Sequence, residues 1–242
     1  MGNSLLSVEN VTKRFGGIQA VGGVSLELGH QEIIGIIGPN GAGKTSFFNL
    51  LSGMFIPDTG KVTFDGKDIT GTDPATRARM GVGRTFQVVR PFKGMSVAEN
   101  VMVPLLVNDP GVSKAHRKAM ELLGDLGIAQ LADTPTEALT LAQRKRVEVA
   151  RALATEPKLL LLDEVLAGLN SREVIDVLPF VTTVRDRGVS ILMIEHIVSA
   201  VMEVSDRMMV LDHGKVLAVG DPQTVIKDPK VIEAYLGSDE EE

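Results

Sequence analysis

Two stretches near the start of the chain alternate between apolar and polar residues. Residues 6–11 and 20–28 have the period of two that is typical of a half-buried strand, and residues 15–17 between them have the composition of a turn. After the turn residues 57–60, residues 61–66 indicate one more strand. We therefore predict an antiparallel hairpin at the start of the chain, followed by a further strand.

Three other segments are continuous apolar runs. Residues 32–37, 158–164 and 190–196 are typical of strands buried on both faces of a parallel sheet. Residues 172–187, between the last two runs, have a helical pattern, and strand–helix–strand alternation implies parallel strands joined by a crossover. The last two runs end in polar residues, and such ends collect at one edge of a parallel sheet. The predicted fold class is α/β.

The middle of the chain is predicted to be a helical insertion. Ser96 and Glu99 have the spacing of a capping box, so a helix is predicted to start at Ser96. Residues 114–126 and 143–154 continue the helical pattern, and the second of these segments is strongly charged on one side.

Weaker signals complete the pattern. Residues 82–88 favour a strand, residues 207–219 favour a hairpin around Asp212-His213-Gly214, and residues 231–236 favour a short last helix.

The composition excludes several classes of protein. The chain has 242 residues, enough for a sizeable core, and no cysteine, which excludes disulfides and thiol chemistry. Its four histidines are scattered without the spacing of metal ligands. The net charge is −6, but residues 239–242 carry four of those charges. The rest of the chain is close to neutral, which argues against a nucleic-acid partner.

The chain shows no signal for a membrane span or for secretion. No apolar run approaches the roughly 18 residues that a span needs, and the start of the chain lacks the regions of a signal peptide. We therefore expect a cytoplasmic protein with an acidic, disordered tail at residues 238–242. Any role at a membrane would depend on partner proteins.

A glycine-rich loop follows the first apolar run. Residues 38–45 match the pattern G-x-x-x-x-G-K-[ST] between a strand and a helix, which is the context that this motif needs. Glycines let several backbone N–H groups point at one anion, and the helix N-terminus favours negative charge. Lys44 adds a cation for the β- and γ-phosphates, and Thr45 adds a hydroxyl for Mg²⁺. The predicted nucleotide-binding residues are Gly38, Pro39, Asn40, Gly41, Ala42, Gly43, Lys44, Thr45 and Ser46.

Asp163 and Glu164 end the second apolar run. A P-loop enzyme uses an Asp at the end of an apolar strand to hold Mg²⁺, and a neighbouring Glu can deprotonate the attacking water. Alone, two acids at a strand end are equally consistent with a solvated end. Together with the glycine-rich loop, they favour a nucleotide triphosphate site.

These motifs, in this order, resemble the ATP-binding subunit of ABC transporters over residues 6–237. The resemblance implies a P-loop NTPase core of the RecA-like kind, with an antiparallel β subdomain and an inserted α-helical subdomain. It implies one domain over residues 5–237. The core and the β subdomain would occupy 5–87 and 155–237, and the helical subdomain with its signature loop would occupy 88–154.

The resemblance also implies roles for single residues. Phe15 is similar to the aromatic residue that stacks on adenine. Gln87 is similar to the Q-loop glutamine, which senses Mg²⁺ and couples to the transmembrane partner. Residues 167–170 resemble the D-loop, and His196 resembles the switch histidine at the γ-phosphate. The implied catalytic residues are Glu164, His196, Lys44 and Gln87, and the implied magnesium ligands are Thr45, Gln87 and Asp163.

Two positions depart from the family pattern. The signature loop, usually Leu-Ser-Gly-Gly-Gln, is Leu-Thr-Leu-Ala-Gln at residues 139–143. We expect Thr140, Ala142 and Gln143 to contact nucleotide, with a helix beginning near Gln143 that offers its dipole to a phosphate. Ala142 replaces a glycine, and its methyl group would crowd the nucleotide or exclude a left-handed backbone. Val165 stands where the family commonly has proline.

Residues 83–87 with Arg90 and Phe92, and residues 96–100, 167–170 and 194–196, are similar to the branched-chain amino-acid uptake branch of the family. The resemblance implies two copies of this or a similar chain, facing head to tail around two ATP molecules. ATP would close this dimer and hydrolysis would reopen it, driving a transmembrane permease at the inner face of the membrane. A solute-binding protein would act indirectly.

Alternatives of the same fold stay open: an ATPase of a lipid or polar-solute exporter, and a weakly hydrolysing nucleotide-binding regulator. Other classes fit less well. A small-molecule kinase would need an arginine-rich lid, and a chromosome-structure ATPase would need sustained heptads. A translation factor would carry a second cassette, and the sequence shows none of these features.

Overall fold

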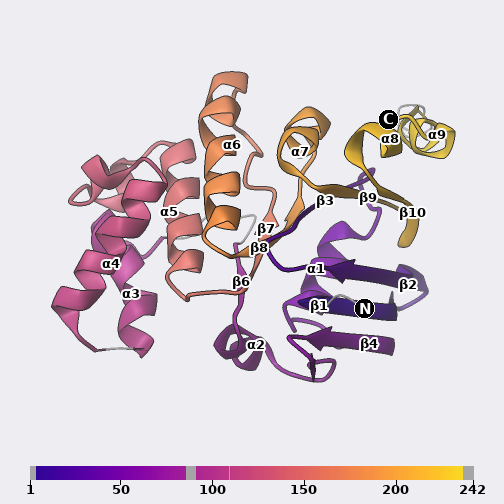
Figure 1. Cartoon of the computed structure of the whole chain (residues 1–242), viewed down its shortest axis with the longest axis horizontal. Coiled ribbons are helices and arrows are strands. Elements are labelled where there is room, and N and C mark those ends of the chain that lie inside the picture. The colour runs from indigo at the N-terminus through magenta and orange to yellow at the C-terminus, as the bar shows by residue number, and fades with distance from the viewer. Residues whose placement is uncertain (1–3, 86–90, 109, 237–242) are drawn as a thin grey trace.

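The computed structural model describes residues 4–85, 91–108 and 110–236. Its first sheet has the strand order β2-β1-β4-β5 and lies on the right in Figure 1. The strands are β1 (Leu6–Phe15), β2 (Ile18–Leu28), β4 (Thr59–Phe64) and β5 (Lys67–Asp68). β1 pairs antiparallel with β2, which confirms the predicted hairpin, and β4 pairs antiparallel with β1 on its other side.

The second sheet is mainly parallel and has the strand order β10-β9-β3-β8-β7-β6 among the described residues. Its strands are β3 (Ile33–Ile37), β6 (Val82–Arg84), β7 (Leu159–Asp163), β8 (Ser190–Ile194), β9 (Arg207–Asp212) and β10 (Lys215–Gly220). β10 pairs antiparallel with β9, which confirms the predicted hairpin. Every residue of β3, β7 and β8 is buried, and this is why their sequences are apolar throughout.

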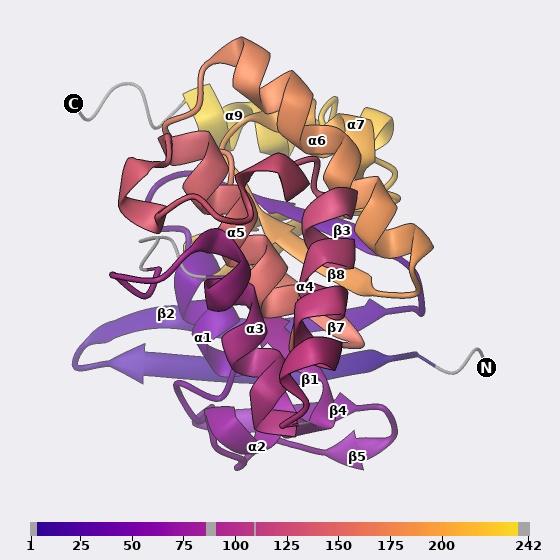
Figure 2. The same cartoon turned by 90° about the vertical axis from the view of Figure 1, so that its left-hand side faces the viewer.

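Helices cover both sheets. They are α1 (Lys44–Leu51), α2 (Pro74–Met80), α3 (Val97–Asn108), α4 (Val112–Asp125), α5 (Leu141–Leu153), α6 (Ser171–Asp186), α7 (Val198–Val204), α8 (Pro222–Val225) and α9 (Pro229–Leu236), with 3₁₀ turns at Ala129–Leu131 and Thr136–Ala138. α3, α4 and α5 form the predicted helical insertion, on the left in Figure 1 and at the front in Figure 2. None of the helices in the described ranges is long and apolar enough to cross a membrane.

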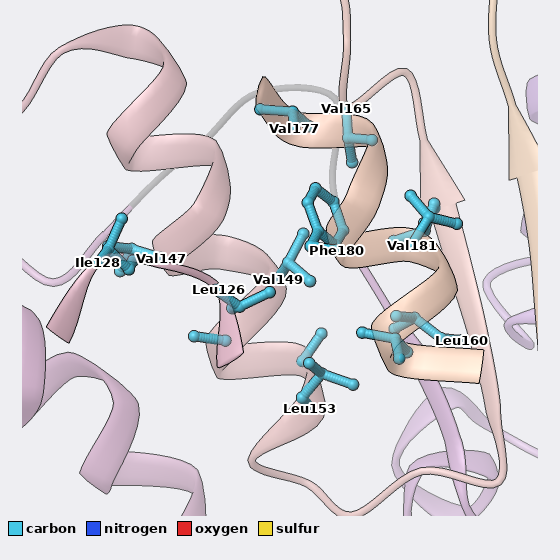
Figure 3. Close-up of a cluster of buried hydrophobic side chains, with 14 of the residues drawn as sticks. Leu126, Ile128, Val147, Val149, Leu153, Leu160, Val165, Val177, Phe180 and Val181 are labelled. Carbon is cyan, nitrogen blue, oxygen red and sulfur yellow. The ribbon is translucent and has the colours of Figure 1, made fainter. Parts of the chain in front are cut away.

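Two large buried clusters fill most of the two faces of the parallel sheet, and a third, smaller cluster packs β3 and β9 against α7 and α8. Ile33 and Leu160 belong to the cluster on the side of α3 to α6. Ile34 and Leu161 belong to the other large cluster, together with Phe47 of α1 and the apolar face of the first sheet. Figure 3 shows part of the first cluster, where side chains of α5 and α6 meet. The helix that follows the glycine-rich loop is thus enclosed between the two sheets.

Some elements differ from the prediction. α5 begins at Leu141, not near Gln143, because Thr140 is its N-cap. α7 and α8 are not predicted by the sequence pattern, since at 7 and 4 residues they are too short to show a helical period. β6 ends at Arg84, and residues 86–88 of the predicted strand lie outside the described residues.

Candidate functional site

The glycine-rich loop runs from the end of β3 to the start of α1. Gly43 is the N-cap of α1 and has a φ of 96°, in the left-handed region. A Cβ atom at Gly43 would lie 2.2 Å from the carbonyl oxygen of Ala20, so only glycine fits there. Gly214, in the β9–β10 turn, donates its N–H to the carbonyl oxygen of Ala42 at 2.9 Å. The loop is therefore held between β2 and that turn, at the N-terminus of α1.

Lys44 folds back over the loop. Its Nζ donates to the carbonyl oxygens of Gly38 and Pro39 at 2.6 and 2.9 Å. Burial lowers the pKa of Lys44, and the negative charge of Glu164 opposes that shift. A buried ammonium group beside a helix N-terminus is an environment that favours a phosphate.

The loop forms one wall of a cleft of about 330 Å³. Glu164 and His196 come from the ends of β7 and β8 and line the same cleft. Nε2 of His196 lies 2.7 Å from Oε1 of Glu164, and the Glu164 side chain is 12 % exposed against 43 % for His196. The structure thus brings together the P-loop, the predicted base and the predicted switch histidine.

Asp163 lies at the end of β7 and is buried. Its Oδ2 accepts a hydrogen bond from Arg84 at 2.8 Å, and its backbone N–H donates to Oγ1 of Thr85. Its Oδ1 is buried and has no hydrogen-bond partner among the described residues. An unpaired carboxylate oxygen fits a divalent cation such as Mg²⁺. Mg²⁺ usually takes one or two protein carboxylates and completes its shell with water and substrate phosphates.

The described residues contain no group of three His, Cys, Asp or Glu side chains that could hold a metal ion on their own. A site with Asp163, the Thr45 hydroxyl and nucleotide phosphates needs no such group. Thr45 lines the P-loop cleft and Asp163 does not, so the fit of Asp163 to Mg²⁺ rests on its buried, unpaired Oδ1.

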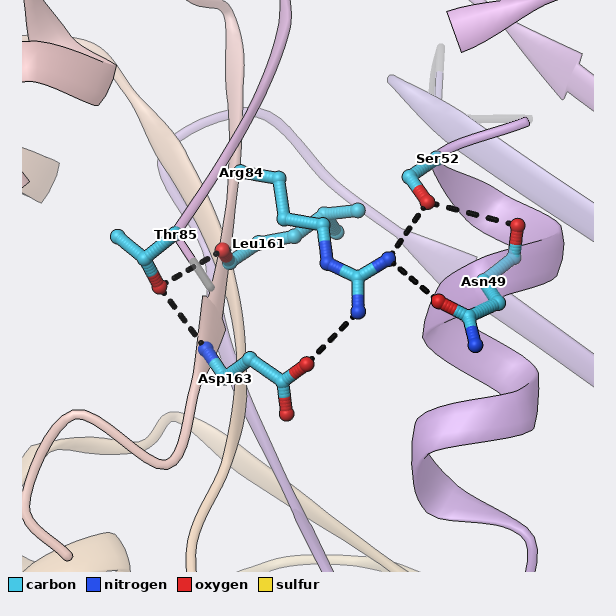
Figure 4. Close-up of polar contacts among 6 residues, drawn as sticks. All are labelled: Asn49, Ser52, Arg84, Thr85, Leu161 and Asp163. Atoms are coloured by element: carbon cyan, nitrogen blue, oxygen red, sulfur yellow. Dashed lines mark hydrogen bonds and ion pairs between the residues drawn. The ribbon is translucent and has the colours of Figure 1, made fainter. Parts of the chain in front are cut away.

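Arg84 contacts the site although no sequence motif indicates it. One guanidinium nitrogen of Arg84 donates to Oδ1 of Asn49 at 2.7 Å and to Oγ of Ser52 at 2.8 Å, while the other donates to Asp163 (Figure 4). Asn49 lies in α1 and Ser52 is its C-cap, so Arg84 joins the P-loop helix to the end of β7. No sequence spacing indicates this link, because the three partners come together only in the folded chain.

Four further residues line the cleft without having been predicted for it: Ile18, Gln19, Ala20 and His213. His213 belongs to the predicted hairpin turn, but its sequence did not indicate that the turn reaches the P-loop. Phe15 is absent from the lining of this cleft. Its ring is 41 % exposed and packs edge-on against Phe55 at 5.0 Å between ring centroids. Gln87, the predicted Q-loop residue, lies outside the described residues.

The signature loop caps its own helix. Oγ1 of Thr140 accepts from the backbone N–H of Gln143, and the Gln143 side chain accepts from the backbone N–H of Thr140. Ala142 lies in the first turn of α5 and does not have a positive φ. The backbone at this position is therefore not left-handed, and an alanine fits it without strain. Among the described residues, the signature loop contributes nothing to the lining of the P-loop cleft of the same chain.

Val165 fits its position as a core residue. It is buried beside Val177 and Phe180 of α6, as Figure 3 shows. An apolar side chain at this position is therefore part of the packing between the β7 end and α6.

The fold and the cleft define a P-loop nucleotide triphosphatase. The family model described as "ABC transporter" matches residues 21–167, and one described as "Branched-chain amino acid ATP-binding cassette transporter" matches residues 215–241. The chain belongs to the ABC transporter family. It is an ATP-hydrolysing subunit of a transporter, similar to ATP-binding proteins of branched-chain amino acid transport.

Curated relatives match almost the whole chain. The high-affinity branched-chain amino acid transport ATP-binding proteins BraF of Pseudomonas aeruginosa and LivG of Escherichia coli are 38 % and 39 % identical to it. Each match covers 98 % of this chain and 99 % of the relative. The lipopolysaccharide export system ATP-binding protein LptB of Haemophilus influenzae is 37 % identical, over 97 % of this chain and 98 % of the relative.

Solved structures agree with the fold. A nucleotide-free ATP-binding cassette from an ABC transporter superposes with a TM-score of 0.87 at 34 % identity, covering 96 % of this chain and 98 % of that one. An ATP-binding cassette in its ADP conformation gives 0.87 at 33 % identity, covering 97 % and 99 %. A dimeric cassette in a post-hydrolysis state, at 24 % identity and a TM-score of 0.79, shares the fold.

Proposed function

We propose that the chain powers an importer of branched-chain or related amino acids. The observation that carries the chemical part is the cleft in which Glu164 and His196 lie 2.7 Å apart opposite the P-loop. The importer assignment is supported by the two relatives that are named as branched-chain amino acid transport proteins and by the family model over residues 215–241.

Glu164 is proposed as the general base. Its carboxylate lines the cleft, where it can accept a proton from the water that attacks the γ-phosphate. His196 holds the Glu164 carboxylate through their hydrogen bond and faces the same phosphate. Lys44, at the N-terminus of α1, binds the β- and γ-phosphates.

Thr45, Asp163 and Gln87 are the proposed magnesium ligands. The support for Asp163 is its unpaired, buried Oδ1 among the described residues. Mg²⁺, when bound, neutralises charge on the phosphates. Arg84 fixes the other oxygen of the same carboxylate, which keeps Oδ1 available.

A second copy of the chain, or a similar one, is proposed to complete the site. Thr140 and Gln143 cap α5, Ala142 lies in its first turn, and none of the three lines the cleft of its own chain. A head-to-tail dimer would bring this loop, at the N-terminus of a 13-residue helix, to the γ-phosphate held by the other copy. ATP would then hold the two copies together. Phe15 stays a proposed contact for adenine.

A groove between the helical insertion and the core is the proposed contact for the permease. It has a volume of about 350 Å³ and a mainly apolar wall, formed by residues that include Met54, Ala78, Phe92, Val103, Pro104 and Ala152. These residues come from or adjoin α1, α2, α3 and α5, so a segment seated there would touch both parts of the chain. Through such a contact the ATPase would be held at the inner face of the membrane.

A lipid or polar-solute exporter is the second candidate. The observation that favours it is the lipopolysaccharide export relative, whose identity of 37 % is close to that of the importer relatives. The proposed chemistry of the cleft is the same for both. The two candidates differ only in the membrane partner and its solute.

Purification of the chain with its membrane partner from the native host separates these candidates. The proposal predicts that the partner is an amino-acid permease. It also predicts that vesicles carrying both take up leucine when ATP is present on the ATPase side and the solute-binding protein is present on the other. Recovery of a lipid-export partner, or vesicles that hydrolyse ATP without taking up any branched-chain amino acid, would contradict the importer assignment.

A further inference from the structure

Lys145 is a buried cation in α5, two residues beyond the signature loop. Its Nζ donates to the backbone carbonyl oxygen of Glu164 at 2.9 Å. Burying an ammonium group is unfavourable unless its hydrogen bonds and charge are compensated. Burial lowers the pKa of Lys145, and the charges of Glu195, Glu148 and Glu164 oppose that shift. A buried lysine aimed at the peptide of the proposed base needs an explanation beyond packing.

The loop after Asp163 is held from two sides. Glu164 has a φ of 51°, a left-handed conformation that is unfavourable for a non-glycine residue. From the α5 side, Lys145 holds the Glu164 carbonyl oxygen. From the β8 side, the buried carboxylate of Glu195 accepts the backbone N–H of Leu166 at 2.8 Å. The backbone that carries the Glu164 side chain is therefore fixed by side chains of two different elements.

α5 carries both the signature loop and Lys145. At about 1.5 Å per residue, Lys145 lies roughly 7 Å along the helix from the N-cap Thr140. α5 packs against α6 and the β7 end through residues such as Val149 and Phe180 (Figure 3). Leu141, the first residue of α5, covers the loop as well, since a Cβ on Gly168 would lie 3.1 Å from its Cδ2. A shift of the signature loop is thus transmitted to the Glu164 peptide over one rigid helical turn.

We propose that Lys145 is a positioning residue through which the signature loop of one copy controls Glu164 in the same copy. In the dimer of the proposed function, on which this inference rests, that loop contacts the nucleotide of the second copy. ATP bound by one chain would then set the Glu164 peptide of the other chain through α5 and Lys145. The two sites would hydrolyse ATP cooperatively, and Lys145 would be one of the physical links between them.

The test is Lys145→Met, which keeps a long apolar stem and removes the N–H donor. We expect kcat to fall about tenfold, in line with the loss of a hydrogen bond from a charged donor. The KM for ATP should stay within about twofold, because Lys145 does not line the P-loop cleft. The Hill coefficient for ATP should fall towards 1. Lys145→Arg keeps a charged donor and should restore both kcat and the Hill coefficient. If Lys145→Met acted only by destabilising α5, Lys145→Arg would not be expected to restore both.

Lys118→Met is the matched control. It removes one positive charge from α4 of the same helical insertion, at a side chain that is 40 % exposed, and should behave as wild type. Wild-type kcat and Hill coefficient in folded Lys145→Met would overturn the inference. If Lys145→Met does not fold, Lys145→Gln takes its place. Its side chain is one atom too short to reach the Glu164 carbonyl, so wild-type values in that variant would overturn the inference equally.

The proposed function fails in a different way. If the wild-type chain forms no ATP-dependent dimer, or shows a Hill coefficient of 1, the head-to-tail arrangement itself is wrong, and the inference falls with it. If wild type is dimeric and cooperative while Lys145→Met is unchanged, only the role of Lys145 is wrong.

Discussion

Glu195 is a buried acid one residue before His196. Burial raises the pKa of Glu195 to about 7, and the charge of Glu164 acts in the same direction, while the Leu166 N–H and Lys145 oppose the shift. Below about pH 4.5 both the folded and the unfolded chain hold this proton. As the pH rises towards 7, the unfolded chain loses its proton first, so the contribution of Glu195 to stability falls through this window and then levels off.

Glu195→Gln removes this titration and keeps an oxygen that can accept the Leu166 N–H. We predict that the free energy of unfolding of the variant, minus that of wild type, increases by about 2 kcal/mol between pH 5 and pH 8. Urea unfolding at the two pH values measures this difference. A difference that stays constant with pH would show that Glu195 is ionised in the folded chain across this range.

The positions of residues that belong to a local motif could be predicted from the sequence. Lys44 is indicated by the glycines around it, and Asp163 and Glu164 by the apolar strand that they end. Arg84 and Lys145 could not be found in this way. Their partners are distant in sequence, and an arginine in a strand or a lysine in a charged helix has no distinctive pattern.

At the scale of elements, the start of α5 depends on the capping box of Thr140 and Gln143. We predict that Thr140→Ala lowers the free energy of unfolding by about 1 kcal/mol, because the Gln143 N–H loses its acceptor. Thr140→Ser keeps a hydroxyl and should stay close to wild type. Thermal unfolding without nucleotide measures both variants. If Thr140→Ala and Thr140→Ser lost the same amount of unfolding free energy, the threonine methyl group, not the hydroxyl, would stabilise this helix end.

The same capping box explains one error in the predicted elements. Placing the helix start near Gln143 treated Thr140 as a loop residue, although a threonine three residues before a glutamine is a capping signal. The buried strands β3, β7 and β8 were predictable because both of their faces are covered and the apolar run is continuous. α7 was not predictable, because a helix of only seven residues is too short to show a helical period in the sequence.

At the scale of the whole molecule, the groove between the helical insertion and the core is the proposed contact for the permease. Two neighbouring exposed side chains differ in whether they line it. Met54 and Ile56 are similarly exposed, at 53 % and 56 %, but only Met54 lines the groove. We predict that Met54→Asp reduces co-purification with the permease at least fivefold, because a charge would be buried against an apolar partner segment. Ile56→Asp should leave co-purification unchanged.

Met54→Asp and Ile56→Asp should both unfold at the wild-type temperature within a few degrees, since both side chains are on the surface. Equal recovery of the permease with Met54→Asp and with wild type would place the contact elsewhere on the chain.

The proposal as a whole depends on Glu164 acting as the base of a site that two copies share. Glu164→Gln keeps the size of the side chain and removes the proton acceptor. Light scattering during size-exclusion chromatography, with ATP and Mg²⁺, should show this variant as a stable dimer. Its ATP turnover should be about a hundredth of wild type or less. Wild-type turnover, or a monomer with ATP bound, would contradict the proposal.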